Sequence, residues 1–126
     1  MILGIGQDVV SLARFAGVVE RVGVQRLARR ILATSEQKEL EMIDARDRQV
    51  RLLAARFAVK EAFFKATAGI GEATWKEVHV EKSDRGAPLL RVSERLTTQL
   101  GIGRSHATIA HDGDYLVASV ILESKE

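Results

Sequence analysis

The 126-residue sequence predicts an α+β fold, with one long central helix packed on a small antiparallel sheet. Two observations lead to this prediction. Apolar residues recur with the helical period of about 3.6 through the middle of the chain, and they alternate with polar residues near its end. Helices followed by antiparallel strands, rather than helices alternating with strands, are typical of the α+β class. A chain of this length corresponds to a single domain, residues 1–126.

The first segment, Met1–Asp8, predicts a short strand at Ile2–Gly6 that ends on Asp8. Gly4 and Gly6 occupy alternate positions, so one face of this strand is bare and another segment can approach its backbone closely. The third glycine of a dinucleotide-binding fingerprint is missing. Asp8 stands where a strand can present a metal or phosphate ligand, although a turn or cap is the commoner role of such an aspartate.

Capping residues delimit the helices that follow. Ser11 is a suitable N-cap for a helix that ends near Val22, where Gly23 interrupts it. A capping box of Thr34 and Gln37 opens a later helix. The helices predicted here are residues 11–22, a second to about residue 32, residues 35–45, and the central helix from about 47 to 69.

The first two helices are strongly basic. Residues 11–33 contain one acidic residue, Glu20, and five arginines, namely Arg14, Arg21, Arg26, Arg29 and Arg30. Such a segment attracts an acidic partner, whether a protein, a nucleic acid or a membrane surface. A solvated helical face explains the same charges equally well, and the net charge of the whole chain is only +2.

The central helix contains the segment Arg56–Ala66, which has no Gly or Pro and is rich in helix-forming residues. On a helical wheel its apolar residues form two stripes on opposite sides. One stripe consists of Val50, Leu53, Phe57 and Phe64, and the other of Ala55, Val59, Ala62 and Ala66. A helix that is apolar on two sides is expected to be buried between layers.

Glu61 falls inside the first of these stripes. A carboxylate in such a place needs partners, because desolvating a lone charge costs several kcal/mol or more. Lys65, one turn later, is a partner in the favoured Glu-to-Lys order. The two residues are either a structural ion pair at the margin of the core, or a carboxylate prepared for a metal ion with a lysine for phosphate beside it. The helix alone does not decide between them.

Beyond the central helix, Ala68–Gly71 is either a tight turn suited to the close approach of a phosphate or a simple helix C-cap. The hydrophobic period then changes to two, and Pro88 suits the start of an edge strand. The predicted elements are strands at 75–82 and 88–92 around a turn at 83–86, a helix from 93 or 94 to about 100, and strands at 106–110 and 115–122 around a turn at 111–114.

Composition excludes several classes of protein. The chain has no cysteine, so disulfides, thiolate catalysis and cysteine-ligated zinc are excluded. No apolar run approaches the ~20 residues needed to span a bilayer, and the N-terminus lacks the basic region of a signal peptide. We therefore expect a cytoplasmic protein without a membrane partner.

Two carboxylates and several cations stand out, whereas no nucleophile does. Asp8 and Glu61 can hold Mg²⁺ when water and phosphate oxygens complete its octahedron. Lys65, Arg56 and His106 offer positive charge or hydrogen-bond donors to a polyphosphate, although a single histidine is more commonly structural. This combination fits transfer of a phosphate-containing group to an acceptor that another molecule supplies.

Two motifs taken together resemble a known family. Gly4–Val10 followed by Arg14, together with Arg56–Ala66 (RFAVKEAFFKA), resembles the holo-acyl-carrier-protein synthases, the small bacterial phosphopantetheinyl transferases. The later turn with Gly86 and Pro88 and the segment from His106 to Asp112 also match in order and spacing. The resemblance therefore covers essentially the whole chain.

The resemblance implies the 4′-phosphopantetheinyl transferase fold and a Mg²⁺-dependent enzyme. Such an enzyme takes coenzyme A, transfers 4′-phosphopantetheine to a serine of apo acyl carrier protein, and releases adenosine 3′,5′-bisphosphate. The nucleophile is then on the substrate protein, which explains why none was found in this sequence. The resemblance also implies a homotrimer with active sites at the subunit interfaces.

The same resemblance assigns roles to individual residues. Asp8 and Glu61 would hold the metal, and Lys65 would stabilise charge on the phosphates and help to move the serine proton, with Glu61 or a metal-bound water as base. The residues implied to bind coenzyme A are Arg56, Lys65, Gly69, Pro88 and His106. Arg14 and Arg21 would receive the acidic helix of the carrier protein.

Two other functions stay open on the sequence alone. One is a small basic RNA-binding module, which the six aromatic residues and the lack of an aromatic-studded sheet pattern disfavour, so we expect no nucleic-acid partner. The other is a magnesium-dependent phosphotransferase that uses a free nucleotide. The chain has neither a P-loop nor the kinase motif set that such an enzyme commonly carries.

Overall fold

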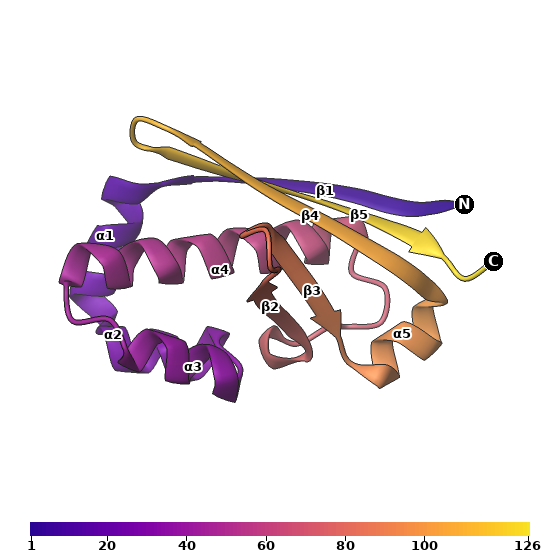
Figure 1. Cartoon of the computed structure of the whole chain (residues 1–126), viewed down its shortest axis with the longest axis horizontal. Helices are drawn as coiled ribbons and strands as arrows, with labels where there is room; N and C mark the ends of the chain where they lie inside the picture. Colours follow the sequence, from indigo (N-terminus) through magenta and orange to yellow (C-terminus); the bar gives the residue numbers. More distant parts are fainter.

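The computed structural model describes all 126 residues, which form five α-helices, one short 3₁₀ helix and five strands (Figure 1). In chain order these are β1 Ile2–Ser11, α1 Leu12–Val22, α2 Val24–Ile31, α3 Thr34–Glu41, α4 Arg46–Ala66, η1 Trp75–Glu77, β2 Val78–Lys82, β3 Pro88–Val92, α5 Glu94–Leu100, β4 Ile102–Asp112 and β5 Tyr115–Ser124. The predicted α+β class, with a long central helix, is confirmed.

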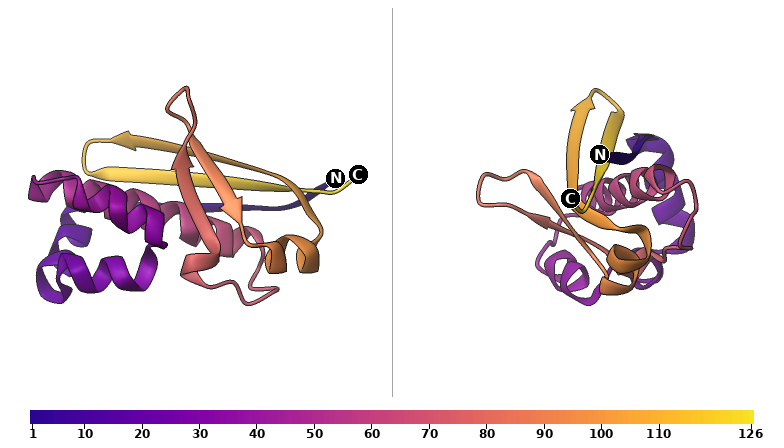
Figure 2. Two further views of the ribbon diagram at one scale, coloured as in Figure 1. Left: turned by 60° about the horizontal axis from the view of Figure 1, so that its bottom comes forward. Right: turned by 90° about the vertical axis from the view of Figure 1, so that its right-hand side faces the viewer.

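The strands are divided between two antiparallel sheets. One has three strands in the order β1-β5-β4, and the other is the hairpin of β2 and β3. Helix α4 contacts β1 and β5 on one side and α1, α2 and β2 on the other, so it lies between two layers (Figure 2). No helix combines the length and the apolar character needed to cross a membrane.

The two apolar stripes predicted for the central helix each face one of these layers. Ala62 lies under β1 and is fully buried, as is Val59 in the same stripe. On the opposite side, Phe57 packs against Phe15 of α1 and against Trp75, with ring centroids 5.4 Å apart in both pairs. The burial of α4 on both sides makes it the core of the protein rather than a surface helix.

The bare face of β1 is in direct contact with the backbone of α4. A Cβ atom at Gly4 would lie 1.9 Å from the carbonyl oxygen of Ala66, and one at Gly6 would lie 1.8 Å from that of Ala62. No side chain fits at either position, because real Cβ atoms do not come this close to other heavy atoms. The close approach predicted from the two glycines is confirmed, and the approaching segment is the central helix.

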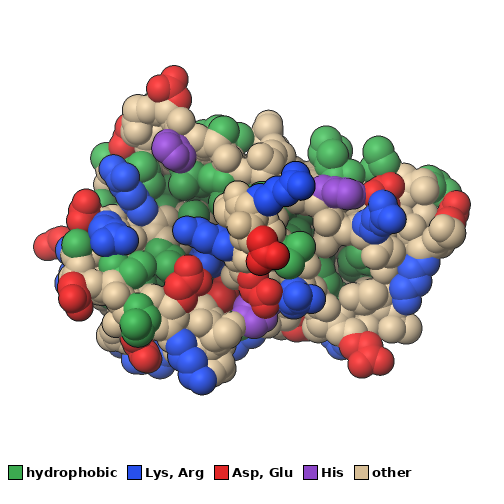
Figure 3. All heavy atoms as spheres, viewed as in Figure 1, with side chains coloured by type: hydrophobic (Ala, Val, Ile, Leu, Met, Phe, Trp, Pro, Cys, Tyr) green, Lys and Arg blue, Asp and Glu red, His purple; other side chains and the backbone are tan.

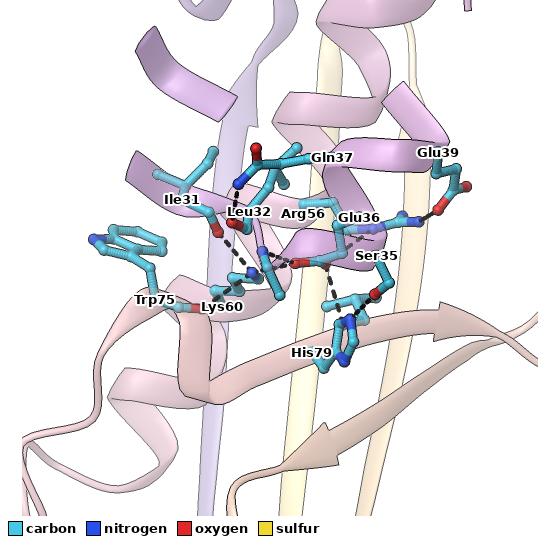
Figure 4. Close-up of polar contacts among 12 residues, drawn as sticks. Ile31, Leu32, Ser35, Glu36, Gln37, Glu39, Arg56, Lys60, Trp75 and His79 are labelled. Atoms are coloured by element: carbon cyan, nitrogen blue, oxygen red, sulfur yellow. Dashed lines mark hydrogen bonds and ion pairs between the residues drawn. The ribbon is translucent and has the colours of Figure 1, made fainter. Parts of the chain in front are cut away.

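A buried ion pair joins α3 to α4. The Lys60 side chain is completely buried, and its Nζ donates to Oε1 of Glu36 at 2.6 Å, to the Ile31 carbonyl at 2.6 Å and to the Trp75 carbonyl at 3.0 Å (Figure 4). Burial lowers the pKa of the Lys60 amine, and the negative charge of Glu36 opposes that shift. The three acceptors come from three segments, so a single amine holds α2, α3 and the first residue of η1 on α4.

Glu36 also accounts for a difference from the predicted capping of α3. The N-cap is Ala33 rather than Thr34, and the Glu36 carboxylate accepts the backbone N–H of Ala33 at 2.8 Å. The other oxygen of Glu36 accepts the N–H of Val80 in β2 at 3.2 Å. The predicted capping box is therefore wrong, because the buried carboxylate supplies the cap and the helix begins at Thr34 itself.

Several other boundaries differ from the predictions. Helix α3 ends at Glu41 rather than 45, α4 ends at Ala66 rather than near 69, and β4 begins at Ile102 rather than 106. Strand β1 continues through Val9 and Val10 to Ser11, because β5 offers pairing partners as far as Tyr115. Trp75–Glu77, predicted as the start of a strand, is a 3₁₀ turn. The predicted N-cap of α1 is confirmed, since Ser11 Oγ accepts the backbone N–H of residue 14 at 3.3 Å.

A second polar cluster surrounds Glu77. Its carboxylate accepts from the Thr74 backbone at 3.2 Å, from Ser93 Oγ at 2.9 Å and from Arg95 Nε at 2.8 Å. These donors, Arg95 above all, hold the pKa of the Glu77 carboxyl at about 2, below its ordinary 4.5. Glu77 therefore fastens the 3₁₀ turn to the start of α5.

Replacing Lys60 by methionine should destabilise the fold by about 3–5 kcal/mol, because it leaves Glu36 buried without its closest charge partner. Urea denaturation of the variant measures this loss. Exposed Lys76, changed to methionine, is the matched control and should stay within about 0.5 kcal/mol of wild type. Equal stabilities of the two variants would contradict a dominant role for the buried pair.

Glu77 should give the fold a pH-dependent component of stability. A depressed pKa in the folded state stabilises the fold above the unfolded value of 4.5, and this contribution is lost as the pH falls towards 2. The Tm difference between wild type and Glu77→Gln should therefore be largest near neutral pH and shrink steadily below pH 4.5. A difference that does not change with pH would mean that the Glu77 charge contributes nothing.

Candidate functional site

Asp8 and Lys65 meet where β1 crosses the last turns of α4. Asp8 shares a strand face with Gly4 and Gly6, so its carboxylate points towards the helix. Lys65 Nζ lies 3.0 Å from Asp8 Oδ1 and donates to the Gln7 carbonyl at 3.0 Å. The Asp8 side chain is 13% exposed and that of Lys65 is 52% exposed, so the pair forms the edge of an accessible site.

Glu61 lies on α4 close enough to both residues to be affected by their charges. Burial raises the pKa of the Glu61 carboxyl above its ordinary value, the negative charge of Asp8 raises it further, and Lys65 lowers it. The ion pair expected between Glu61 and Lys65 is not formed, because Lys65 reaches across to Asp8 and the Gln7 carbonyl instead. The site is thus two neighbouring carboxylates with one lysine.

The donor set of this site fits a hard divalent cation. Carboxylate oxygens are the ligands that Mg²⁺ prefers, and the ion commonly keeps water or phosphate oxygens in its other positions. The mutual repulsion of Asp8 and Glu61, visible in the raised pKa of Glu61, is the kind of charge that a dication offsets. No group of three or more His, Cys, Asp or Glu side chains is arranged to hold a metal, so Asp8 and Glu61 are the only side chains of these four types that this site supplies.

Arg56 lies on a different side of α4. It lies five positions before Glu61, and this spacing corresponds to roughly 140° around the helix. It is buried, with its guanidinium 2.7 Å from Glu39 and 3.3 Å from Glu36. It also borders a pocket of about 550 Å³ whose other basic residues are Arg48, Arg51 and Lys82.

Pro88 flanks the same region, because it pairs in register with Lys82 across the β2–β3 hairpin. Gly69 lies instead in the turn that follows Lys65. Its φ of +78° is in the left-handed region, and a Cβ built there would meet nothing within 4 Å, so its backbone is open to approach. The structure therefore places Gly69 near the carboxylate site and Pro88 near the pocket of Arg56.

His106 lies on the face of the three-stranded sheet that points away from α4. It pairs in register with Ile121 of β5, whereas Asp8 pairs with the inward-facing Ala118. His106 Nε2 lies 2.5 Å from a carboxylate oxygen of Glu123. Within one chain, His106 and Asp8 are therefore on opposite faces of the sheet.

Arg14 and Arg21 border a groove of about 880 Å³ between α1, α2 and α4. Its walls are mainly apolar and include Phe15, Leu27 and Phe57. The groove reaches residues 9–11 of β1, directly after Asp8, so it leads from the arginines towards the carboxylates. Three of the five arginines predicted to form a basic face, Arg14, Arg21 and Arg30, thus border this groove, whereas Arg26 and Arg29 line a separate pocket.

Lys60 was missed as a key residue, although a signal for it exists. At about 100° per residue, Lys60 lies only roughly 20° from Leu53, at the edge of an apolar stripe. The reasoning that singled out Glu61 applies to Lys60 equally. Its partner Glu36 is 24 positions away and could not be identified from spacing.

Comparisons of the sequence and of the structure with known proteins point to the same family. Residues 4–120 match the 4′-phosphopantetheinyl transferase superfamily. The holo-[acyl-carrier-protein] synthase of Oceanobacillus iheyensis is 37% identical over 127 residues, which cover 100% of both chains. Among solved structures, the holo-[acyl-carrier-protein] synthase of Neisseria meningitidis superposes with a TM-score of 0.87 at 33% identity, covering 98% of this chain and 100% of that one.

A further solved structure contains a ligand. It is a holo-(acyl-carrier-protein) synthase from Bacillus anthracis in complex with CoA (3′,5′-ADP). It superposes with a TM-score of 0.81 at 33% identity and covers 99% of each chain. The fold described above is therefore shared along its whole length with proteins of one enzymatic family.

Proposed function

Because this chain belongs to the 4′-phosphopantetheinyl transferase superfamily and is a transferase of the holo-acyl-carrier-protein synthase type, we propose that it moves 4′-phosphopantetheine from coenzyme A to a serine of apo acyl carrier protein, with adenosine 3′,5′-bisphosphate as the other product. The observation that carries the proposal is the carboxylate pair of Asp8 and Glu61 beside Lys65, with no nucleophile of the chain among them. The nucleophile is the serine of the carrier.

Asp8 and Glu61 would hold Mg²⁺, which when bound stabilises negative charge on the pyrophosphate of coenzyme A. Lys65, exposed at the edge of the site, stabilises the same charge as the phosphorus–oxygen bond to the leaving group breaks. Glu61 accepts the proton of the attacking serine hydroxyl. Burial and Asp8 raise the pKa of Glu61 in the metal-free chain, and a bound dication would oppose this shift.

The nucleotide end of coenzyme A carries a separate phosphate and needs its own contacts. Arg48, Arg51 and Lys82 offer cations to that phosphate in the pocket around Arg56, whose own guanidinium is paired with Glu36 and Glu39, and Pro88 stands nearby for the adenine. This pocket and the carboxylates lie on different sides of α4. We propose that one subunit supplies Asp8, Glu61 and the turn at Gly69, and that a neighbour supplies the pocket and His106.

A homotrimer would bring these residues together. The outward face of the three-stranded sheet exposes Leu3 (43%), Ile5 (70%) and Val9 (59%), and Figure 3 shows apolar side chains along this margin of the molecule. His106 lies on the same face. An exposed apolar face of this kind is typical of a subunit interface, and a heterologous contact that closes on itself gives a ring of subunits.

The groove behind Arg14 and Arg21 is the proposed docking site for the carrier protein. An acidic helix would place its carboxylates on the arginines and an apolar side chain on Phe15 and Phe57. The contact would bring the carrier serine towards Asp8, because the groove reaches Val9, the next residue of β1. Rim charges of this sort mostly affect the association rate and its dependence on salt.

The intact mass of an apo acyl carrier protein, incubated with this enzyme, coenzyme A and Mg²⁺, tests the proposal directly. The carrier should gain the mass of one phosphopantetheine, and a chelator should prevent the gain. A folded carrier that keeps its mass would contradict the proposed substrate. Transfer that is insensitive to the chelator would contradict the metal requirement.

Changing Glu61 to glutamine should lower kcat at least about 100-fold, because the amide keeps the shape of the side chain but neither accepts the proton nor binds a dication well. The fold should be unaffected, as measured by the Tm. Exposed Glu41, changed to glutamine, is a matched control and should have wild-type kcat. Wild-type activity of the Glu61 variant would remove this residue from the mechanism.

Changing Arg14 to glutamate should raise the KM for the carrier protein at least about tenfold and leave the KM for coenzyme A unchanged, because like charges then face each other at the rim. Steady-state kinetics at low and high salt measure the effect, which should shrink as salt is added. Lys38→Glu makes the same charge change at an exposed position of α3 and serves as control. Equal KM values for the two variants would place the docking surface elsewhere.

A further inference from the structure

The turn after α4 has an unusual backbone. Four of the five residues in the segment Ala68–Glu72 have positive φ, and two of them are not glycine, since φ is +53° at Ala68 and +47° at Glu72. Left-handed conformations of non-glycine residues persist only where the surroundings hold them. The segment must therefore be held by contacts from elsewhere in the fold.

Helix α5 supplies these contacts. Arg95 Nη2 donates to the carbonyl of Gly71 at 3.0 Å and to that of Glu72 at 3.5 Å. The same guanidinium binds Glu77 through two bonds, from Nε at 2.8 Å and from Nη2 at 2.9 Å. The side chain of Leu96 packs against Gly71, since a Cβ at this glycine would lie 3.1 Å from Leu96 Cδ2.

Arg95 is itself held on both sides. Nη1 donates to Gln99 Oε1 at 3.2 Å, one turn further along α5. Glu77 is fixed by its hydrogen bonds from Thr74 and Ser93. The guanidinium is therefore a rigid link between α5 and the turn, because its fork makes several bonds in one plane.

The held turn bears directly on the proposed site. It begins three residues after Lys65, and its Gly69 backbone is open on the side where a Cβ would stand. Ile70 beside it is 64% exposed, so the turn presents backbone and one apolar side chain to solvent. Its position decides whether a bound phosphate or pantetheine arm can lie against the backbone next to Lys65.

We propose that Arg95 is a positioning residue for coenzyme A binding, acting through the turn Ala68–Glu72. Arg95 does not touch the substrate. It holds the carbonyls of Gly71 and Glu72, and so keeps Gly69 in the orientation that lets the donor approach Lys65. This role rests on the proposed function, and it adds a residue of α5 that no motif of the sequence had marked.

Arg95→Gln tests the proposal through three readouts. The KM for coenzyme A, and its Kd by calorimetry, should rise roughly tenfold, because small misplacements of contact groups weaken binding and catalysis strongly. The KM for the carrier protein should change less than twofold, since the groove on α1 and α2 lies away from α5. Amide hydrogen exchange should accelerate in residues 68–72 and not in α4.

Two further variants act as controls. Arg91→Gln removes an arginine–glutamate pair with Glu81 of similar geometry, 3.0 Å from Nε to the carboxylate, that holds no backbone carbonyl. It should leave all three readouts unchanged. Arg95→Lys keeps the charge but not the fork, so its coenzyme A KM should lie between those of wild type and Arg95→Gln.

An Arg95→Gln variant with the wild-type KM for coenzyme A would overturn the proposal. Parallel increases in both KM values together with a lowered Tm would also overturn it, because they would show a general loss of structure. Wild-type protein that neither binds coenzyme A nor modifies the carrier would overturn the proposed function first. That result is distinct from the others because it appears without any substitution.

Discussion

The buried carboxylate of Glu36 is the constraint on which the arrangement of this protein depends. It accepts from Lys60, from the backbone of Ala33 and from the backbone of Val80, and it lies 3.3 Å from the guanidinium of Arg56. A charge that is nine-tenths or more removed from water is tolerated only when partners satisfy it. Glu36 therefore joins helices α3 and α4 and strand β2 at one buried point.

This network also determines which way Glu61 and Lys65 face. Lys60 and Glu61 are neighbours in sequence and point in directions roughly 100° apart. With Lys60 held by three acceptors on the side of α2 and α3, α4 cannot rotate about its axis. Glu61 and Lys65 are then directed towards β1 and Asp8. The hydrogen bonds of Lys60 on one side of α4 thus orient Glu61 and Lys65 on another side.

Local patterns in the sequence predicted what depends on local physics. The helical period of α4, the N-cap at Ser11 and the bare strand face at Gly4 and Gly6 needed no knowledge of distant residues. The two motifs that contain Asp8 and Glu61 led to the family because their residue types and order are specific. These features are expressed over stretches of ten or so residues, where sequence reasoning is strongest.

The remaining features depend on partners far apart in the chain. An ion pair of Lys65 with Glu61, one turn away, was one of two interpretations of the sequence, but Lys65 pairs instead with Asp8 of β1, 57 positions away. Likewise the cap of α3 comes from a carboxylate whose burial is caused by α4 and β2. Spacing identifies neighbours on one element. It does not show which element will lie opposite, and an ion pair goes to the nearest charge that the tertiary fold provides.

The contact of Gly4 and Gly6 with α4 has a consequence for how this site tolerates change. Strand and helix touch backbone to backbone, with carbonyl oxygens where side chains would otherwise stand. The spacing between the two carboxylate-bearing elements is therefore a property of the main chain and is independent of the size of any core residue. Substitutions that change the size of a core side chain should therefore leave the separation of these two elements unchanged at their contact.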